Sequence, residues 1–116
     1  MNLLSGVSIE ETETYAKSIK KLQKRFKHIE TDCDNFIDSI QSTDDLGVDL
    51  GNGIYKVRIA NSDKQSGKST GYRLISYLKL VDKILYLMYI YDKSDMSTVS
   101  EKQVDRLIKK NILNKS

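Results

Sequence analysis

Hydrophobic residues in the first forty positions recur at the spacing of an α-helix. A first stripe, with intervals of four, three and four residues, consists of Tyr15, Ile19, Leu22 and Phe26. Lysine and arginine fill most positions between them, so the chain from Thr14 onward is predicted to form an amphipathic helix. A second stripe consists of Ile29, Cys33, Phe36, Ile37 and Ile40. The two stripes together predict a helical hairpin.

After Gly53 the hydrophobic period shortens to two residues, which is typical of a β-strand. One face of this strand would carry Tyr55, Val57 and Ile59, and the other face Lys56 and Arg58. A weaker alternation at residues 7–10 predicts a short first strand.

Two further strands are predicted at residues 72–80 and 84–91, and the short turn between them indicates a hairpin. The second of these strands is apolar or aromatic on both faces. We therefore expect it to lie centrally in the sheet, with neighbours covering both sides.

A last helix is predicted near the C-terminus, after a capping-box pattern from Thr98 to Glu101. Its apolar positions are Val104, Leu107, Ile108 and Ile112. Residues 41–53 are rich in turn formers and are predicted to close the helical part. The predicted fold class is α+β, a single domain over residues 1–116. We expect a small antiparallel sheet with the N-terminal helical hairpin packed on one face and a C-terminal helix, so that the other face is left for function.

The amino-acid composition excludes several classes of protein and of metal site. The 116 residues are 39% hydrophobic and 30% charged, which fits one globular domain. There is no run of eighteen apolar residues and no signal-peptide pattern, so we expect a cytoplasmic protein without a membrane partner. A single cysteine, Cys33, excludes an internal disulfide, and with one histidine, His28, the chain lacks the ligands of an ordinary zinc site. We expect no metal and no cofactor.

The charge is distributed unevenly. Residues 1–52 hold six Lys and Arg against ten Asp and Glu, whereas residues 53–116 hold thirteen against six. The densest positive stretch runs from Lys56 to Arg73. Such a basic half favours a polyanionic or acidic partner, and a solvated lysine-rich face is the alternative.

The basic side chains of this stretch are predicted to converge on one sheet face. Lys56 and Arg58 precede an antiparallel connection that leads, through Lys68, to Tyr72 and Arg73. Cations gathered in this way would neutralise backbone phosphates. Because Tyr72 and Arg73 alternate, one must face the core, and we expect Arg73 to be the exposed one, so that Arg73→Ala would cost little stability.

Tyrosines interleave with these cations. Tyr72 and Tyr77, or Tyr89 and Tyr91 on the central strand, are candidates for stacking on RNA bases. The alternative is that they belong to the core with their hydroxyls at its rim, which we expect for most of the seven tyrosines.

Three segments in order resemble the RelE/HigB branch of the RelE/ParE toxin superfamily. They are residues 53–60 (GIYKVRIA), 67–75 (GKSTGYRLI) and 90–93 (IYDK), and the resemblance covers about residues 10 to 110. It implies a fold like that of microbial ribonucleases and a ribosome-dependent messenger-RNA endonuclease that inhibits translation. The implied partners are a cognate antitoxin, the ribosome and messenger RNA.

Site residues follow from the resemblance position by position. It implies catalytic roles for Lys56, Arg58, Arg73 and Lys93, and RNA-binding roles for Lys68, Tyr72 and Tyr91. The chain departs from the family pattern by having Thr70 where glycine is usual and by lacking a C-terminal tyrosine. The resemblance therefore does not identify the residue that acts as general base. Two alternatives stay open as well: a ParE-like gyrase inhibitor without nuclease activity, and a non-enzymatic RNA-binding module.

Overall fold

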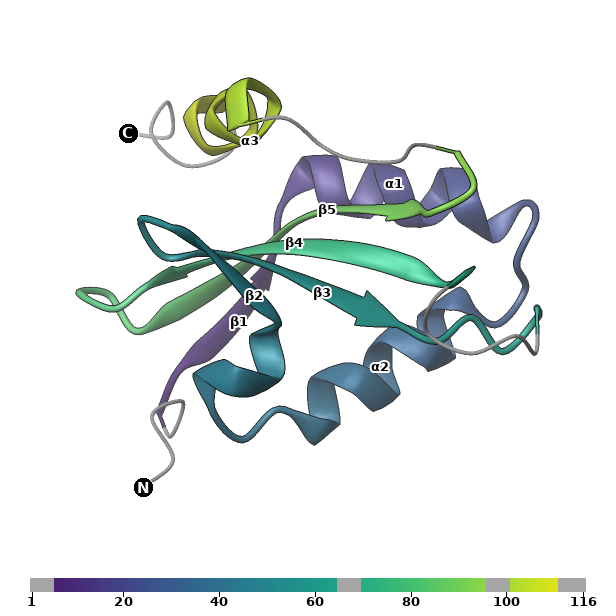
Figure 1. Cartoon of the computed structure of the whole chain (residues 1–116), viewed down its shortest axis with the longest axis horizontal. Coiled ribbons are helices and arrows are strands. Elements are labelled where there is room, and N and C mark those ends of the chain that lie inside the picture. Colours follow the sequence, from purple (N-terminus) through teal and green to yellow (C-terminus); the bar gives the residue numbers. More distant parts are fainter. Residues whose placement is uncertain (1–5, 65–69, 96–100, 111–116) are drawn as a thin grey trace.

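A five-stranded mixed sheet forms the centre of the molecule (Figure 1). The computed structural model describes residues 6–64, 70–95 and 101–110. The strands are β1 (Ser8–Glu11), β2 (Val48–Gly51), β3 (Ile54–Ile59), β4 (Tyr72–Lys79) and β5 (Ile84–Asp92), in the spatial order β1-β5-β4-β3-β2. β1 runs parallel to β5, and the other neighbours are antiparallel. The predicted α+β class is confirmed, with a mixed sheet in place of a purely antiparallel one.

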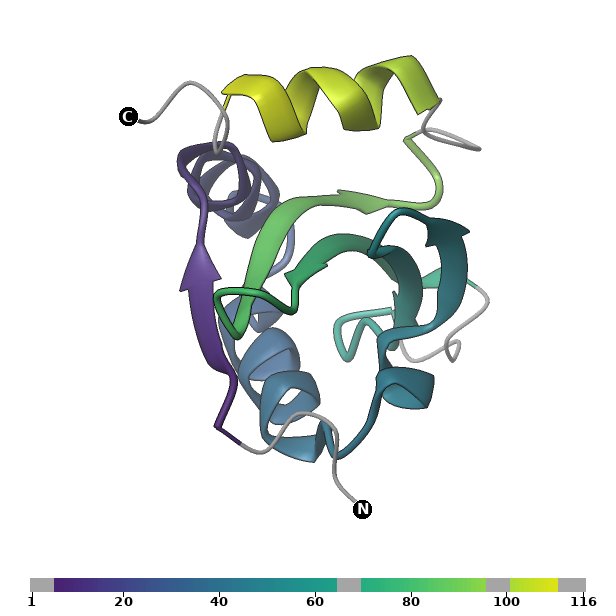
Figure 2. The ribbon, with the colours of Figure 1, turned by 90° about the vertical axis from the view of Figure 1, so that its left-hand side faces the viewer.

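Helices cover both faces of this sheet. They are α1 (Glu13–Gln23), α2 (Ile29–Ser39), the short 3-10 helix η1 (Thr43–Leu46) and α3 (Glu101–Ile108). Figure 2 shows α3 on the opposite side of β5 from α2. The helical hairpin predicted from the two hydrophobic stripes is confirmed. Among the described helices, none is both long and apolar enough to cross a lipid bilayer.

Thr12 fixes the start of α1 against the sheet. Its hydroxyl oxygen accepts the Tyr15 N–H at 3.2 Å, and the same hydroxyl donates to the Leu87 carbonyl of β5 at 2.8 Å. An N-cap of this kind satisfies a helix donor that has no partner within the helix. One buried residue therefore begins the helix and attaches it to the strand beside it.

The larger core lies between the sheet and the pair α1–α2. It includes Tyr15, Leu22 and Ile29 from the helices and Leu74, Leu87 and Ile90 from the strands. On the other face, Leu107 and Ile108 of α3 pack against a smaller core of Ile54, Ile75 and Met88. The central strand predicted at residues 84–91 is thus confirmed, because β5 lies between two strands and is covered on both faces.

A β-bulge in β5 decides which of its side chains face which core. Ser76 of β4 pairs with Leu87, whereas the preceding Ile75 pairs with Tyr89, so Met88 is an extra residue. A regular register would have placed Ile90 opposite Arg73. The bulge places Tyr91 there instead.

Residues 41–53 contain regular structure that the turn-former prediction missed. η1 and β2 both lie here, and β2 pairs with β3. The four residues of β2 are all exposed, so they carry no alternation of buried and exposed positions. Asn52 and Gly53, both at positive φ, form the two-residue turn between the strands. Three predicted features lie outside the residues whose side chains are described. They are Lys68, the capping-box pattern from Thr98 to Glu101, and Ile112.

Candidate RNA-cleaving site

A row of side chains crosses three strands on the face opposite to the α1–α2 hairpin. Arg58 of β3 pairs with Arg73 of β4, and Arg73 pairs with Tyr91 of β5. Side chains directly opposite in an antiparallel pair have Cβ atoms about 4.5–5.5 Å apart. The register therefore brings two guanidinium groups and a phenol together although fifteen and eighteen positions separate them in the sequence.

Two lysines extend this row. Lys56 lies two residues before Arg58, on the same face of β3, and pairs with Ile75. Lys93 follows the last residue of β5, is exposed, and its backbone N–H donates to the Gly71 carbonyl at 3.1 Å. Strand alternation places Lys93 on the side of Tyr91. We call Lys56, Arg58, Arg73 and Lys93 the cationic face.

Arg73 lies on the predicted face, but the expectation that it is exposed is wrong. Only 6% of the residue is accessible, because β4 is an interior strand with neighbours on both sides. Its Nη1 donates to the Tyr72 carbonyl at 3.2 Å. Burial, followed by the positive charge of Arg58, lowers the pKa of Arg73. A partly dehydrated cation of this kind interacts more strongly with a phosphate than a fully solvated one does.

Tyr72, predicted to contact RNA, points to the other side of the sheet, so this conformation does not expose its side chain on the cationic face. Its side chain is wholly buried in the core, where it meets Phe26 edge to face with ring centroids 5.8 Å apart. Burial also raises the pKa of the Tyr72 hydroxyl. The residue contributes to the fold and cannot be reached by a base.

Tyr91 lies on the cationic face but is only 3% accessible. Its ring stacks on that of Tyr89 with centroids 5.9 Å apart, and burial raises the pKa of its hydroxyl. Tyr89 is half-buried. Of these two aromatic rings, Tyr89 is the one that a base can approach.

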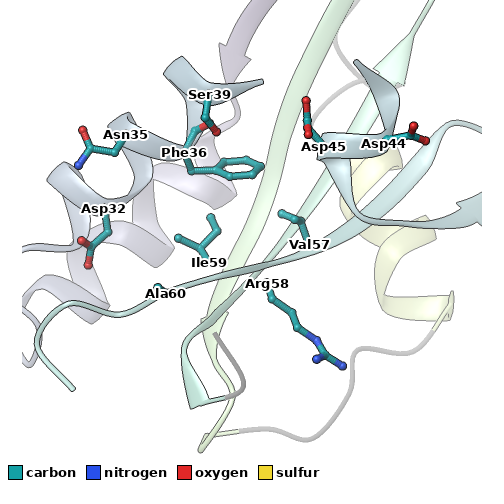
Figure 3. Close-up of a pocket in the computed structure, with 10 residues that line it drawn as sticks. All are labelled: Asp32, Asn35, Phe36, Ser39, Asp44, Asp45, Val57, Arg58, Ile59 and Ala60. Atoms are coloured by element: carbon teal, nitrogen blue, oxygen red, sulfur yellow. The ribbon is translucent and has the colours of Figure 1, made fainter. Parts of the chain in front are cut away.

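An acidic cavity of about 480 Å³ lies on the opposite side of β3, between that strand, α2 and η1. Figure 3 shows Arg58 directed away from Asp32, Asp44 and Asp45, which surround the opening. Asp45 accepts the Gln41 and Ser42 N–H groups, and Asp32 accepts the Ser62 N–H. Two of the three carboxylates therefore bind the backbone. Arg58 lines the cavity as well, but its side chain extends away from these carboxylates (Figure 3).

Comparison with known families identifies the family of the chain. The family described as the RelE toxin of the RelE / RelB toxin-antitoxin system matches residues 10–114. The chain belongs to the RelE toxin family. The matched residues include all four members of the cationic face, and no curated protein was found to match the chain.

The remaining reactive side chains of the toxin lie away from this face. Cys33 is buried in the helix-side core, where burial raises the pKa of its thiol to about 11. His28 precedes α2, and its Nδ1 lies 2.7 Å from an oxygen of Asp63. Within the described ranges, no three His, Cys, Asp or Glu residues are grouped as a metal ion would require.

A buried carboxylate at the end of β5 was not identified from the sequence. Asp92 is wholly inaccessible, and Lys64 Nζ lies 2.8 Å from its carboxylate. Burial alone would raise the pKa of Asp92, but the hydrogen bonds from Lys64 and Ser94 outweigh it and lower the pKa below its ordinary value. No sequence spacing pairs residues 64 and 92, so this contact becomes visible only in the folded chain.

Proposed function

We propose that this toxin is a ribosome-dependent endonuclease that cleaves messenger RNA in the cytoplasm and so inhibits translation. Family membership establishes the toxin class. The observation that supports RNA cleavage is the meeting of Lys56, Arg58 and Arg73 on one sheet face, with Lys93 at its end. A phosphodiester is the substrate that such a set of cations suits.

The chemistry we propose uses the RNA's own 2′-hydroxyl as nucleophile. The 2′-oxygen bonds to phosphorus, the bond from phosphorus to the 5′-oxygen breaks, and the products are a 2′,3′-cyclic phosphate and a 5′-hydroxyl. The step needs a base at the 2′-oxygen, cations on the phosphoryl oxygens and an acid at the 5′-oxygen. We assign all three roles to side chains of the cationic face.

Roles divide according to what each cation can do with a proton. An arginine guanidinium keeps its proton in proteins, so Arg58 and Arg73 are assigned to the phosphoryl oxygens. A lysine ammonium can release and regain a proton, so the two proton transfers are assigned to Lys56 and Lys93. The single histidine, His28, stands outside the site.

The side chains of the cationic face also explain why we expect cleavage to depend on the ribosome. The face offers no imidazole, which is the side chain best suited to proton transfer near neutral pH. Correct orientation of the reacting atoms can replace several kcal/mol of barrier. We therefore assign the alignment of the 2′-oxygen with the scissile bond to the ribosome, and the stabilisation of charge to the toxin.

The test is cleavage of a 5′-labelled message by the purified toxin, with and without programmed ribosomes. We expect cleavage only on the ribosome, loss of cleavage in Lys56→Ala, and normal cleavage in Lys27→Ala, which removes an exposed lysine between α1 and α2. An intact message together with inhibited gyrase would assign the toxin to the gyrase-inhibiting branch. Tight RNA binding without cleavage would make it a binding module.

A further inference from the structure

The surroundings of Asp92 join three parts of the chain. Lys64, in the segment after β3, donates from Nζ both to the Asp92 carboxylate at 2.8 Å and to the Thr70 carbonyl at 3.0 Å. Ser94 donates its backbone N–H to the same carboxylate at 3.2 Å and its hydroxyl at close range. We call Lys64, Asp92 and Ser94 the Asp92 clamp.

The clamp is shielded from water on the helix side of the sheet. The side chain of Asp92 has no accessible surface, and that of Lys64 is 23% exposed. The Lys64 ammonium also lies 5.5 Å from the centre of the Phe26 ring. Arg25 reaches the edge of the cluster, with Nη2 3.7 Å from Asp92 and Nη1 3.0 Å from Asp95.

The two segments that the clamp ties together are those that carry Arg73 and Lys93. Thr70 lies three residues before Arg73, and Asp92 lies directly before Lys93. Asp92 pairs with Tyr72 in the register of β4 and β5, and the Lys93 N–H donates to the Gly71 carbonyl. Any shift of Lys64 relative to Asp92 would therefore move the backbone next to both cations.

Stability alone is a poor reason for such a pair. Two charges withdrawn from water lose hydration, and apolar replacements of buried ion pairs are often neutral or stabilising. In some proteins, however, a buried ion pair fixes the relative position of the segments that carry it. Here Asp92 directly precedes Lys93 and pairs with Tyr72, the residue before Arg73.

We propose that Lys64 and Asp92 are positioning residues that hold Arg73 and Lys93 in the arrangement needed for RNA cleavage. This inference rests on the proposed endonuclease function. The clamp itself lies on the opposite face of the sheet and contacts no RNA. Its loss should therefore slow the chemical step and leave binding to the ribosome unchanged.

The experiment compares the full-length toxin with Asp92→Asn, Lys64→Met and Lys64→Arg. Asp95→Asn is the matched control, because it removes the charge of a nearby exposed carboxylate that binds Arg25. For each protein, ribosome affinity and the single-turnover cleavage rate at saturating ribosome concentration are measured separately. Misplacement of catalytic groups can cost up to about a hundredfold in rate. We expect a loss approaching that size in Asp92→Asn and Lys64→Met, recovery in Lys64→Arg, and no loss in Asp95→Asn.

Hydrogen exchange at the Lys93 amide provides a readout that does not depend on activity. We expect faster exchange in Asp92→Asn than in the wild type, and no change in Asp95→Asn. Normal cleavage by Asp92→Asn, or an affinity loss as large as its rate loss, would overturn the positioning role. If the wild type does not cleave, the proposed function fails, and unchanged exchange at Lys93 in Asp92→Asn would separately overturn the clamp.

Discussion

Arg73 is the position at which stability and activity should respond in opposite directions. Arg73 is almost wholly buried as a residue and stands directly opposite Arg58 in the sheet. Both features disfavour the charged form, as the lowered pKa of Arg73 indicates. The folded protein therefore keeps a positive charge where folding alone would not place one. Replacing Arg73 with methionine retains an unbranched apolar stem and removes the charge.

The expected effect on stability follows from two opposing contributions. Replacing buried ion pairs with apolar residues of similar volume is often neutral or stabilising by about 1–4 kcal/mol, and we take this range as the upper limit of the gain from removing the buried charge of Arg73. Loss of the hydrogen bond from Nη1 to the Tyr72 carbonyl costs about 1 kcal/mol. We therefore expect the free energy of unfolding of Arg73→Met to lie between about 1 kcal/mol below and about 3 kcal/mol above that of the wild type. Arg73→Ala should instead lose about 2 kcal/mol or more, because it leaves a cavity.

The expected effect on activity is much larger. A donor that stabilises transition-state charge is worth roughly 3 kcal/mol, or a hundredfold or more in rate. Urea denaturation measures the first quantity, and single-turnover cleavage on programmed ribosomes measures the second. Antitoxin binding should persist in Arg73→Met and shows that the fold is intact. An Arg73→Met variant that is strongly destabilised yet cleaves at the wild-type rate would make Arg73 a structural residue and refute this reasoning.

Four further outcomes follow. Tyr72→Ala should lose about 3 kcal/mol of unfolding free energy, whereas Tyr72→Phe should lose none in the same urea titration, because the Tyr72 hydroxyl has no hydrogen-bond partner among the described residues; a large loss in the phenylalanine variant would contradict this. The folded pKa of Asp92 lies below its unfolded value of 3.8, so its carboxylate stabilises the fold above that pH and ceases to do so as the pH falls through the folded pKa. Thermal unfolding across this acid range should accordingly be less pH-dependent in Asp92→Asn. Ribosome affinity should fall as salt is added, because phosphate contacts release counterions, and a flat salt dependence would argue against the cationic face as the binding surface. The antitoxin should protect Lys56 and Lys93 from acylation, and full reactivity of both in the complex would show that it binds elsewhere.

Much of the fold is predictable because its signals are local. The four-three-four spacing of apolar residues identified α1, and the two-residue alternation around Lys56 and Arg58 identified β3. β2 was missed because it is an edge strand whose side chains are all exposed. The Asn52–Gly53 pair was the signal that could have found it, since this dipeptide favours the turn of a β-hairpin.

The sheet face that carries the basic side chains was predictable from the sequence, but the burial of these side chains was not. Alternation along β3 and β4 identified the face that carries Arg58 and Arg73. The burial of Arg73 depends on strands that lie beside it only after folding, and the place of Tyr91 depends on the bulge at Met88. Residues 84–91 are apolar or aromatic throughout, so a one-residue shift in register leaves no trace in their hydrophobic pattern.

The chemistry at the cut ends of a ribosome-bound message tests the central claim most directly. Mass spectrometry of the fragments, taken over a time course, gives both the nature of each end and the rate at which it forms. We predict a 2′,3′-cyclic phosphate and a 5′-hydroxyl from the wild type and from Lys27→Met, and the same ends about a hundredfold more slowly from Arg58→Met. A message that stays intact with the wild type, or that Arg58→Met cuts as fast as Lys27→Met, would contradict the assignment of RNA cleavage to the cationic face.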